Sequence, residues 1–211
     1  MDKKPKILIH CPIGYMYEES YNSILNLDTT GLEVDFYFTY FNPIDPRWDE
    51  QGREKDSRWR YNIAFKMNKA RQIVLAFKYD FMLNVESDMI IPKNTLKELL
   101  KYAKLNNVVG ALYRARAGRN PNTPLCLHIK MPNGQITWPD EDYIKDKEVI
   151  EAYTIPFGCT LFGRRVLELI NFKEGIDGTF ALETDRLGIK KLVITSVRAK
   201  HIDRNGIIWE V

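Results

Sequence analysis

The stretch YDFMLNVESDMIIP, from Tyr79 to Pro92, decides the predicted fold. Its first part, Phe81 to Val85, is apolar on both faces, as a central parallel strand covered by helices on each side would be. Two carboxylates, Glu86 and Asp88, follow at once with one serine between them. Residues two apart in an extended chain project to the same side, so we expect the pair to point together from the carboxyl end of this strand. That edge is where open α/β sheets bind their ligands.

The segments around this strand alternate between strand and helix patterns. Apolar and β-branched runs predict strands, and apolar residues recurring every three or four positions predict helices. The strands are expected at 6–11, from 33, from 108 and at 191–198, and the helices up to about 27, at 61–78, after Pro92 and near 177–187. Thr95 and Glu98 have the spacing of a capping box. The alternation predicts an α/β fold with a mostly parallel sheet flanked by helices.

Two segments interrupt this pattern, and a third resumes it. The polar stretch Asn42 to Arg60, broken by proline and glycine, reads as an exposed loop. The stretch 125–139, LCLHIKMPNGQITWP, follows a basic loop and reads as an inserted β-hairpin with its turn at Asn133 and Gly134. The stretch 152–172 is expected to form a loop and then a helix.

The totals exclude several classes of protein. With 211 residues, of which 45% are hydrophobic, the chain can form one domain with a substantial core. A net charge of +3 is too small to indicate nucleic acid or an anionic membrane as the main partner. There is no apolar run of about eighteen residues, so we predict a cytoplasmic protein without a transmembrane segment. Cys11, Cys126 and Cys159 lie far apart, as reduced and packed thiols would.

The carboxylate pair indicates half of a metal site. Adjacent carboxylates repel unless a positive charge lies beside them, and hard oxygen ligands suit Mg²⁺ or Mn²⁺ bound to phosphates. The alternative interpretation is that Ser87 and Asp88 only cap the following helix. The capping-box spacing at Thr95 argues against it, because that helix would then have its own start.

Two longer segments resemble a known family. The run FKMNKARQIVLAFKYDFMLNVESDMIIPKNTLKELL (65–100) resembles the nucleotide-sugar segment of GT-A fold, family 2-like glycosyltransferases, and IPFGCTLFGRRVLELINFKEGIDGTFALETDRLGIKKLVITSVRAKH (155–201) resembles their acceptor segment. The resemblance implies a single GT-A domain over 1–211 with a Rossmann-like sheet. Its nucleotide-sugar-binding half would cover about 1–110 and its acceptor-binding and catalytic half about 111–211. It also implies a metal-dependent, inverting, hexosyltransferase-type enzyme that uses a nucleoside diphosphate sugar.

The same resemblance assigns metal ligands and a base. Asp88 would bind Mn²⁺ or Mg²⁺ directly, Glu86 would contact the ribose or bind the metal through water, and His201 would be an additional ligand. Asp177 would remove the proton from the acceptor hydroxyl. Taken alone, a late histidine is more often structural, and Asp177 could equally be a helix N-cap. His10 and His128 lack this context and are assigned to packing.

The remaining assignments concern the donor. The resemblance places nucleotide-sugar contacts at Cys11, Pro12, Lys66, Asn68, Arg71, Glu86, Ser87, Asp88 and Gly158. Without it, the three residues from 66 to 71 read as the polar face of a helix and Gly158 as a turn residue. Phe157 offers a face on which a sugar ring could stack. Arg164 and Arg165 would hold phosphate or, as we favour, only begin a helix.

The partners are then a nucleoside diphosphate sugar and an unidentified glycan, lipid-linked or protein acceptor, approached through the segment from Arg114 to Lys147. A catalytically inactive nucleotide-sugar-binding protein is the first alternative, because Glu86 stands where the family more often has Asp and Ile176 replaces an acidic neighbour of Asp177. A nucleotidyltransferase fits less well, since HCPIGYMYEES (10–20) has a single glycine and no phosphate loop. A nuclease would have only Arg114, Arg116 and Arg119 as a basic patch.

Overall fold

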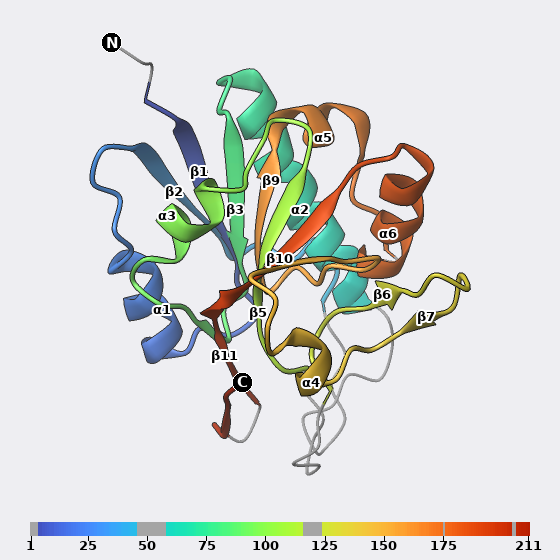
Figure 1. The fold of residues 1–211 in the computed structure, drawn as a ribbon. Coiled ribbons are helices and arrows are strands. Elements are labelled where there is room, and N and C mark those ends of the chain that lie inside the picture. The colour runs from blue at the N-terminus through green and yellow to red at the C-terminus, as the bar shows by residue number, and fades with distance from the viewer. Residues whose placement is uncertain (1–3, 46–57, 116–123, 175, 204–205) are drawn as a thin grey trace.

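A computed structural model describes residues 4–45, 58–115, 124–174, 176–203 and 206–211. Its centre is a seven-stranded sheet (Figure 1). From one edge to the other the strands are β2 (Glu33–Thr39), β1 (Lys6–Pro12), β3 (Phe81–Val85), β9 (Cys159–Gly163), β5 (Val108–Leu112), β10 (Lys191–Arg198) and β8 (Val149–Glu151). Five strands run in one direction, whereas β9 and β8 run against their neighbours. The predicted α/β class with a mostly parallel sheet is confirmed.

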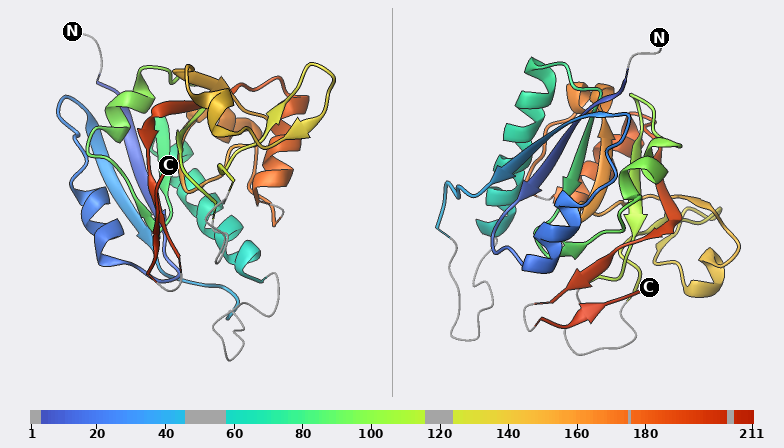
Figure 2. Two further views of the ribbon diagram at one scale, coloured as in Figure 1. Left: turned by 60° about the horizontal axis from the view of Figure 1, so that its bottom comes forward. Right: turned by 90° about the vertical axis from the view of Figure 1, so that its left-hand side faces the viewer.

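Helices cover both faces of the sheet (Figures 1 and 2). One face carries α2 (Arg58–Ala76), α5 (Arg164–Leu169) and α6 (Ile176–Arg186), and the other carries α1 (Glu18–Leu25) and α3 (Thr95–Leu100). Alternate strand residues supply the two cores. Leu8 and Met82 face the first layer, whereas Ile7, Ile9 and Leu83 face the second. The strand pattern expected around Phe81 therefore has both faces buried because a helical layer lies on each side.

Smaller elements complete the chain. The predicted hairpin is present as β6 (Ile129–Lys130) and β7 (Ile136–Thr137), and Gly134 at its turn has φ of +83°. The short helix α4 (Glu141–Ile144) leads from it toward β8. A second sheet joins β4 (Met89–Ile90), β11 (Lys200–Ile202) and β12 (Ile208–Trp209). Within the described ranges, no helix combines the length and apolar character that crossing a membrane requires.

Three local expectations are wrong. The stretch read as loop and helix contains the buried strand β9 before α5 begins. The capping box does not form, because Asn94 precedes α3 without a side-chain cap and the buried Thr95 Oγ1 has no hydrogen-bond partner among the described residues. The polar stretch expected to be a loop as far as Arg60 already belongs to α2 from Arg58 onward. Residues 46–57 of that stretch lie outside the described residues.

Candidate active site

The chain turns immediately after β3. The Met89 amide donates to the Glu86 carbonyl at 3.1 Å, so residues 86–89 form a turn and do not continue the strand. The expectation that Glu86 and Asp88 project together as alternate residues of an extended chain is therefore wrong. Glu86 is half-buried, while Asp88 is buried and reaches the second sheet, where its carbonyl accepts from the Ile202 amide at 2.8 Å.

Asp88 lies opposite His201. Strand β11 pairs with β4 so that His201 stands beside Met89, and His201 Nε2 lies 3.5 Å from Asp88 Oδ2. The other ring nitrogen, Nδ1, lies 3.0 Å from the Arg114 carbonyl. A carbonyl can only accept, so Nδ1 carries a proton and, in the neutral ring, Nε2 turns its lone pair toward the carboxylate. A cation between these two groups, either a proton or a metal ion, would satisfy both.

The donor set fits a divalent cation. A carboxylate oxygen and an imidazole nitrogen are ligands that Mn²⁺ accepts, and neighbouring ligands of an octahedral ion with bonds of about 2.1 Å lie about 3 Å apart. A metal-binding histidine commonly donates its second N–H to a backbone carbonyl, as His201 does to Arg114. Among the described residues, no three His, Cys, Asp or Glu side chains group closely enough to hold a metal. Phosphate and water would therefore have to complete the coordination.

Tyr113, at the end of β5, links this pair to Glu86. Its ring packs edge-on against His201, with centroids 5.7 Å apart, and its hydroxyl accepts from the Gly158 amide at 2.8 Å. The Gly158 carbonyl in turn accepts from the Glu86 amide at 2.9 Å. A Cβ on Gly158 would overlap the Tyr113 hydroxyl. Only glycine fits at position 158, because Tyr113 occupies the space that a side chain would need.

Asp177 belongs to the same region. It lies in the first turn of α6, inside the helix and not at its cap. Burial raises the pKa of Asp177 to about 7, with Arg60 opposing the shift. The negative charges of Glu86 and Asp177 both help to raise the pKa of Tyr113 well above its ordinary value, after burial itself. Both carboxylates therefore lie near Tyr113, and Asp177 has the pKa of a general base at neutral pH.

The end of β1 also lies near Glu86. Burial, followed by the charge of Glu86, raises the pKa of Cys11 to about 12. Lys66 is buried, donates to the Ile13 carbonyl and has a pKa lowered to about 8 by burial. Pro12 is buried in the strand end, and Ser87 is buried in the turn after β3. Four of the residues predicted to contact the nucleotide sugar therefore lie near Glu86: Cys11, Pro12, Lys66 and Ser87.

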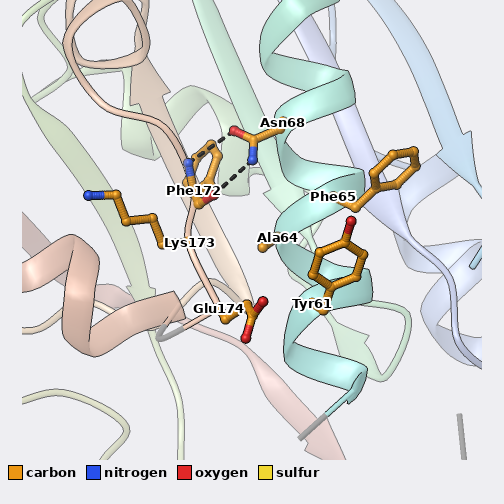
Figure 3. Close-up of a pocket in the computed structure, with 7 residues that line it drawn as sticks. All are labelled: Tyr61, Ala64, Phe65, Asn68, Phe172, Lys173 and Glu174. Atoms are coloured by element: carbon orange, nitrogen blue, oxygen red, sulfur yellow. Dashed lines mark hydrogen bonds between the residues drawn. The ribbon is translucent and has the colours of Figure 1, made fainter. Parts of the chain in front are cut away.

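Asn68 and Arg71 have other contacts. The Asn68 side chain brackets Phe172, with its Nδ2 2.8 Å from the Phe172 carbonyl and its Oδ1 3.0 Å from the Phe172 amide (Figure 3). Arg71 donates to the Leu167 carbonyl. Both side chains join α2 to the chain around α5. Their assignment to the nucleotide stays a prediction.

Other polar residues are structural. His10 is buried between Asn84 and Thr39, at 2.8 and 2.9 Å, and burial lowers its pKa to about 3. His128 packs on Trp138 of the hairpin. The contacts of His10 and His128 agree with the prediction that these two histidines have a packing role.

Three further predictions concern an aromatic residue and two sets of arginines. Phe157 is 1% exposed within a cluster of phenylalanines, so it offers no face to a sugar, contrary to expectation. Arg164 and Arg165 begin α5, as favoured, and Arg164 lies by Asp80 at the start of β3, the end opposite Glu86. Arg116 and Arg119 lie outside the described residues.

Sequence reasoning missed Tyr113, Cys126 and Arg60. Cys126 forms a side-chain hydrogen bond with Tyr113, and burial, Asp177 and Glu86 raise its pKa. Arg60 lies near Asp177 because α2 begins earlier than expected. Only Tyr113 carried a usable signal, since it is an aromatic residue at the carboxyl end of a predicted parallel strand.

Comparisons with known proteins reach this chain through structure alone. No family model and no curated protein sequence matches it. The crystal structure of A197 from STIV matches with a TM-score of 0.58 and 14% identity, over 98% of this chain and 93% of A197. The crystal structure of GalNAc-T7 with UDP, GalNAc and Mn²⁺ matches with a TM-score of 0.59 and 12% identity, over 96% of this chain and 44% of that one. The fold is therefore similar to that of a GT-A glycosyltransferase.

Proposed function

We propose that this protein is a metal-dependent glycosyltransferase that moves a sugar from a nucleoside diphosphate sugar to an acceptor hydroxyl. The observation that carries the proposal is the buried Asp88 and His201 pair, with the second nitrogen of His201 turned to the Arg114 carbonyl. The pair stands beside the turn after β3, at the sheet edge where α/β folds bind ligands. The fold of GalNAc-T7, solved with UDP, GalNAc and Mn²⁺, supports the same reading.

Asp88 and His201 would hold Mn²⁺ or Mg²⁺. The ion would stabilise the negative charge that the leaving nucleoside diphosphate gains as the glycosidic bond breaks. Glu86, Ser87, Cys11, Pro12 and Lys66 would meet the nucleotide, because the ends of β1 and β3 lie together. Lys66 would carry positive charge toward the phosphates at pH values below about 8.

Asp177 would act as the base of an inverting reaction. Its carboxylate would take the proton of the acceptor hydroxyl while that oxygen forms a bond to the anomeric carbon. The bond from the anomeric carbon to the phosphate oxygen would break, and its electron pair would leave with the nucleoside diphosphate. The raised pKa of Asp177 supports this role, since a base with a pKa near the working pH transfers protons efficiently.

The test is release of nucleoside diphosphate from UDP-, GDP-, CDP- and dTDP-sugars. We expect one donor class to be hydrolysed or transferred with Mn²⁺, and the activity to be lost on chelation and in Asp88→Ala. His128→Ala is the matched control, because His128 packs against the hairpin. Activity unchanged in Asp88→Ala would refute the metal assignment, and no turnover of any donor would refute the transferase.

A further inference from the structure

A pocket of about 530 Å³ opens between α2 and the chain that leads from α5 to α6 (Figure 3). Tyr61, Ala64 and Phe65 form its wall on α2, and Phe172 and Glu174 lie across from them. Its volume is in the range of sites that take small organic ligands. None of its lining residues belongs to the turn that carries Asp88.

The pocket is held open by fixed walls. The two hydrogen bonds between Asn68 and the Phe172 backbone tie its far wall to α2. One turn further along α2, Arg71 donates to the Leu167 carbonyl near the end of α5. A ligand would therefore meet a preformed site and would not have to order it.

The proposed base lies close to the pocket along the chain, although Asp177 is not one of the lining residues. Glu174 is three residues before Asp177 in the chain, and α2 contacts α6. Arg60, the neighbour of Tyr61, lies near enough to lower the pKa of Asp177 against the effect of burial. A molecule bound between Tyr61 and Glu174 would thus lie near the first turn of α6, which carries Asp177.

The lining selects the chemistry of the ligand. Tyr61 is 38% exposed, and with Phe65 it offers aromatic surface to the C–H faces of a sugar ring. Figure 3 shows Glu174 extending toward α2, whereas Lys173 extends away from it and forms an ion pair with Glu183. The charge facing the space is therefore a carboxylate, which accepts hydrogen bonds from sugar hydroxyls and repels a nucleoside diphosphate.

We infer that this pocket binds the acceptor and that the acceptor is a saccharide. The inference rests on the proposed function and narrows it, from a glycan, lipid-linked or protein acceptor to a carbohydrate that presents a hydroxyl to Asp177. Tyr61 stacks on the terminal sugar, and Glu174 binds its hydroxyls. The acceptor is thus bound on the α2 side of Asp177, not through the segment from Arg114 to Lys147.

The test is saturation-transfer NMR without donor or metal, using methyl glucoside, methyl galactoside, methyl N-acetylgalactosaminide, maltose, cellobiose and lactose. We expect at least one saccharide of this panel to bind both the wild type and Asp88→Ala. Its affinity should fall about tenfold in Tyr61→Ala and in Glu174→Gln. Trp138→Ala is the control, since Trp138 is an exposed aromatic residue on the hairpin. It should bind as the wild type does.

Two results would overturn the inference. One is that no saccharide of the panel binds, and the other is that Tyr61→Ala and Glu174→Gln bind as tightly as the wild type. Donor turnover without saccharide binding would reject the pocket and leave the transferase. Saccharide binding in a protein that turns over no donor would reject the acceptor role together with the transferase.

Discussion

His201 is oriented by contacts on three sides: the Arg114 carbonyl at Nδ1, Asp88 at Nε2 and the edge-on ring of Tyr113. A histidine held in this way loses little conformational entropy when its Nε2 binds a cation. The same residue is hard to assign from sequence, because its partners are 87 and 113 positions away in the chain. Its place after the last predicted strand is the only local signal.

We expect His201→Ala to lower the affinity for Mn²⁺ in the presence of UDP by about tenfold or more, since even the partners of metal ligands contribute that much. The signal of free Mn²⁺ in electron paramagnetic resonance measures this directly. His128→Ala should leave the affinity unchanged. Equal Mn²⁺ affinity in wild type and His201→Ala would remove His201 from the site.

Asp177 should couple stability to pH. Its pKa is about 7 when folded and about 3.9 when unfolded, so the folded chain keeps a proton that the unfolded chain releases between these values. Stability from this group is complete below pH 4 and is lost as the pH rises to 7. Asp177→Asn should therefore raise the melting temperature relative to wild type at pH 8 but not at pH 4.

The same substitution should stop sugar transfer while leaving donor binding intact. In the wild type, transfer should increase with pH through about 7 as the base ionises. A melting-temperature difference independent of pH would contradict the raised pKa. Normal turnover in Asp177→Asn would remove it as the base.

At the scale of elements, the sequence predicted the five parallel strands and the flanking helices and missed the two antiparallel strands, β9 and β8. The segment PFGCTLFG is a short apolar run followed by a helix, and a short apolar run alone fits a buried strand or a buried helix equally. Strand β9 is antiparallel between two parallel strands, which the alternation of strand and helix could not indicate. Without β9, Gly158 cannot be placed beside Tyr113.

The turn after β3 was missed for a similar reason. The capping-box spacing of Thr95 and Glu98 suggested that nothing structural remained for residues 86–88. In the structure, Glu98 instead pairs with Lys101, and the chain forms β4 before α3. Strand β4 pairs with Lys200 and His201 of β11, more than 100 residues further along the chain, and no local pattern contains these contacts.

Gly158 precedes β9 and forms backbone hydrogen bonds to residues that follow β3 and β5, namely Glu86 and Tyr113. Gly158→Ala should force Tyr113 to move and lower the free energy of unfolding by about 1–3 kcal/mol, a typical cost of overpacking. Urea denaturation measures the change. Gly178→Ala is the matched control, since an added Cβ meets no atom within 4 Å in α6 and alanine favours a helix. Equal stability of Gly158→Ala and wild type would show that Tyr113 does not occupy that space.

At the scale of the whole molecule, the sheet brings the ends of β1, β3, β5 and β10 to one edge. The α/β class and the carboxylate edge could be predicted because strand and helix patterns alternate and two carboxylates follow a buried strand. The GT-A type was implied only by the resemblance of the two longer segments. Only the resemblance placed Asp88 and His201 in one site, and no pattern in the sequence indicated the pocket on α2. Both depend on segments that meet only in the folded chain.

The measurement that tests the central claim most directly is a thermal-shift titration with UDP, GDP, CDP and dTDP, with and without Mn²⁺, on wild type and Asp88→Ala. A ligand that binds only the folded state raises its stability. We predict that one nucleoside diphosphate raises the melting temperature of the wild type only when Mn²⁺ is present, and that Asp88→Ala loses this response. No stabilisation by any nucleotide, or an equal response in Asp88→Ala, would contradict a metal-bound nucleotide at Asp88 and His201.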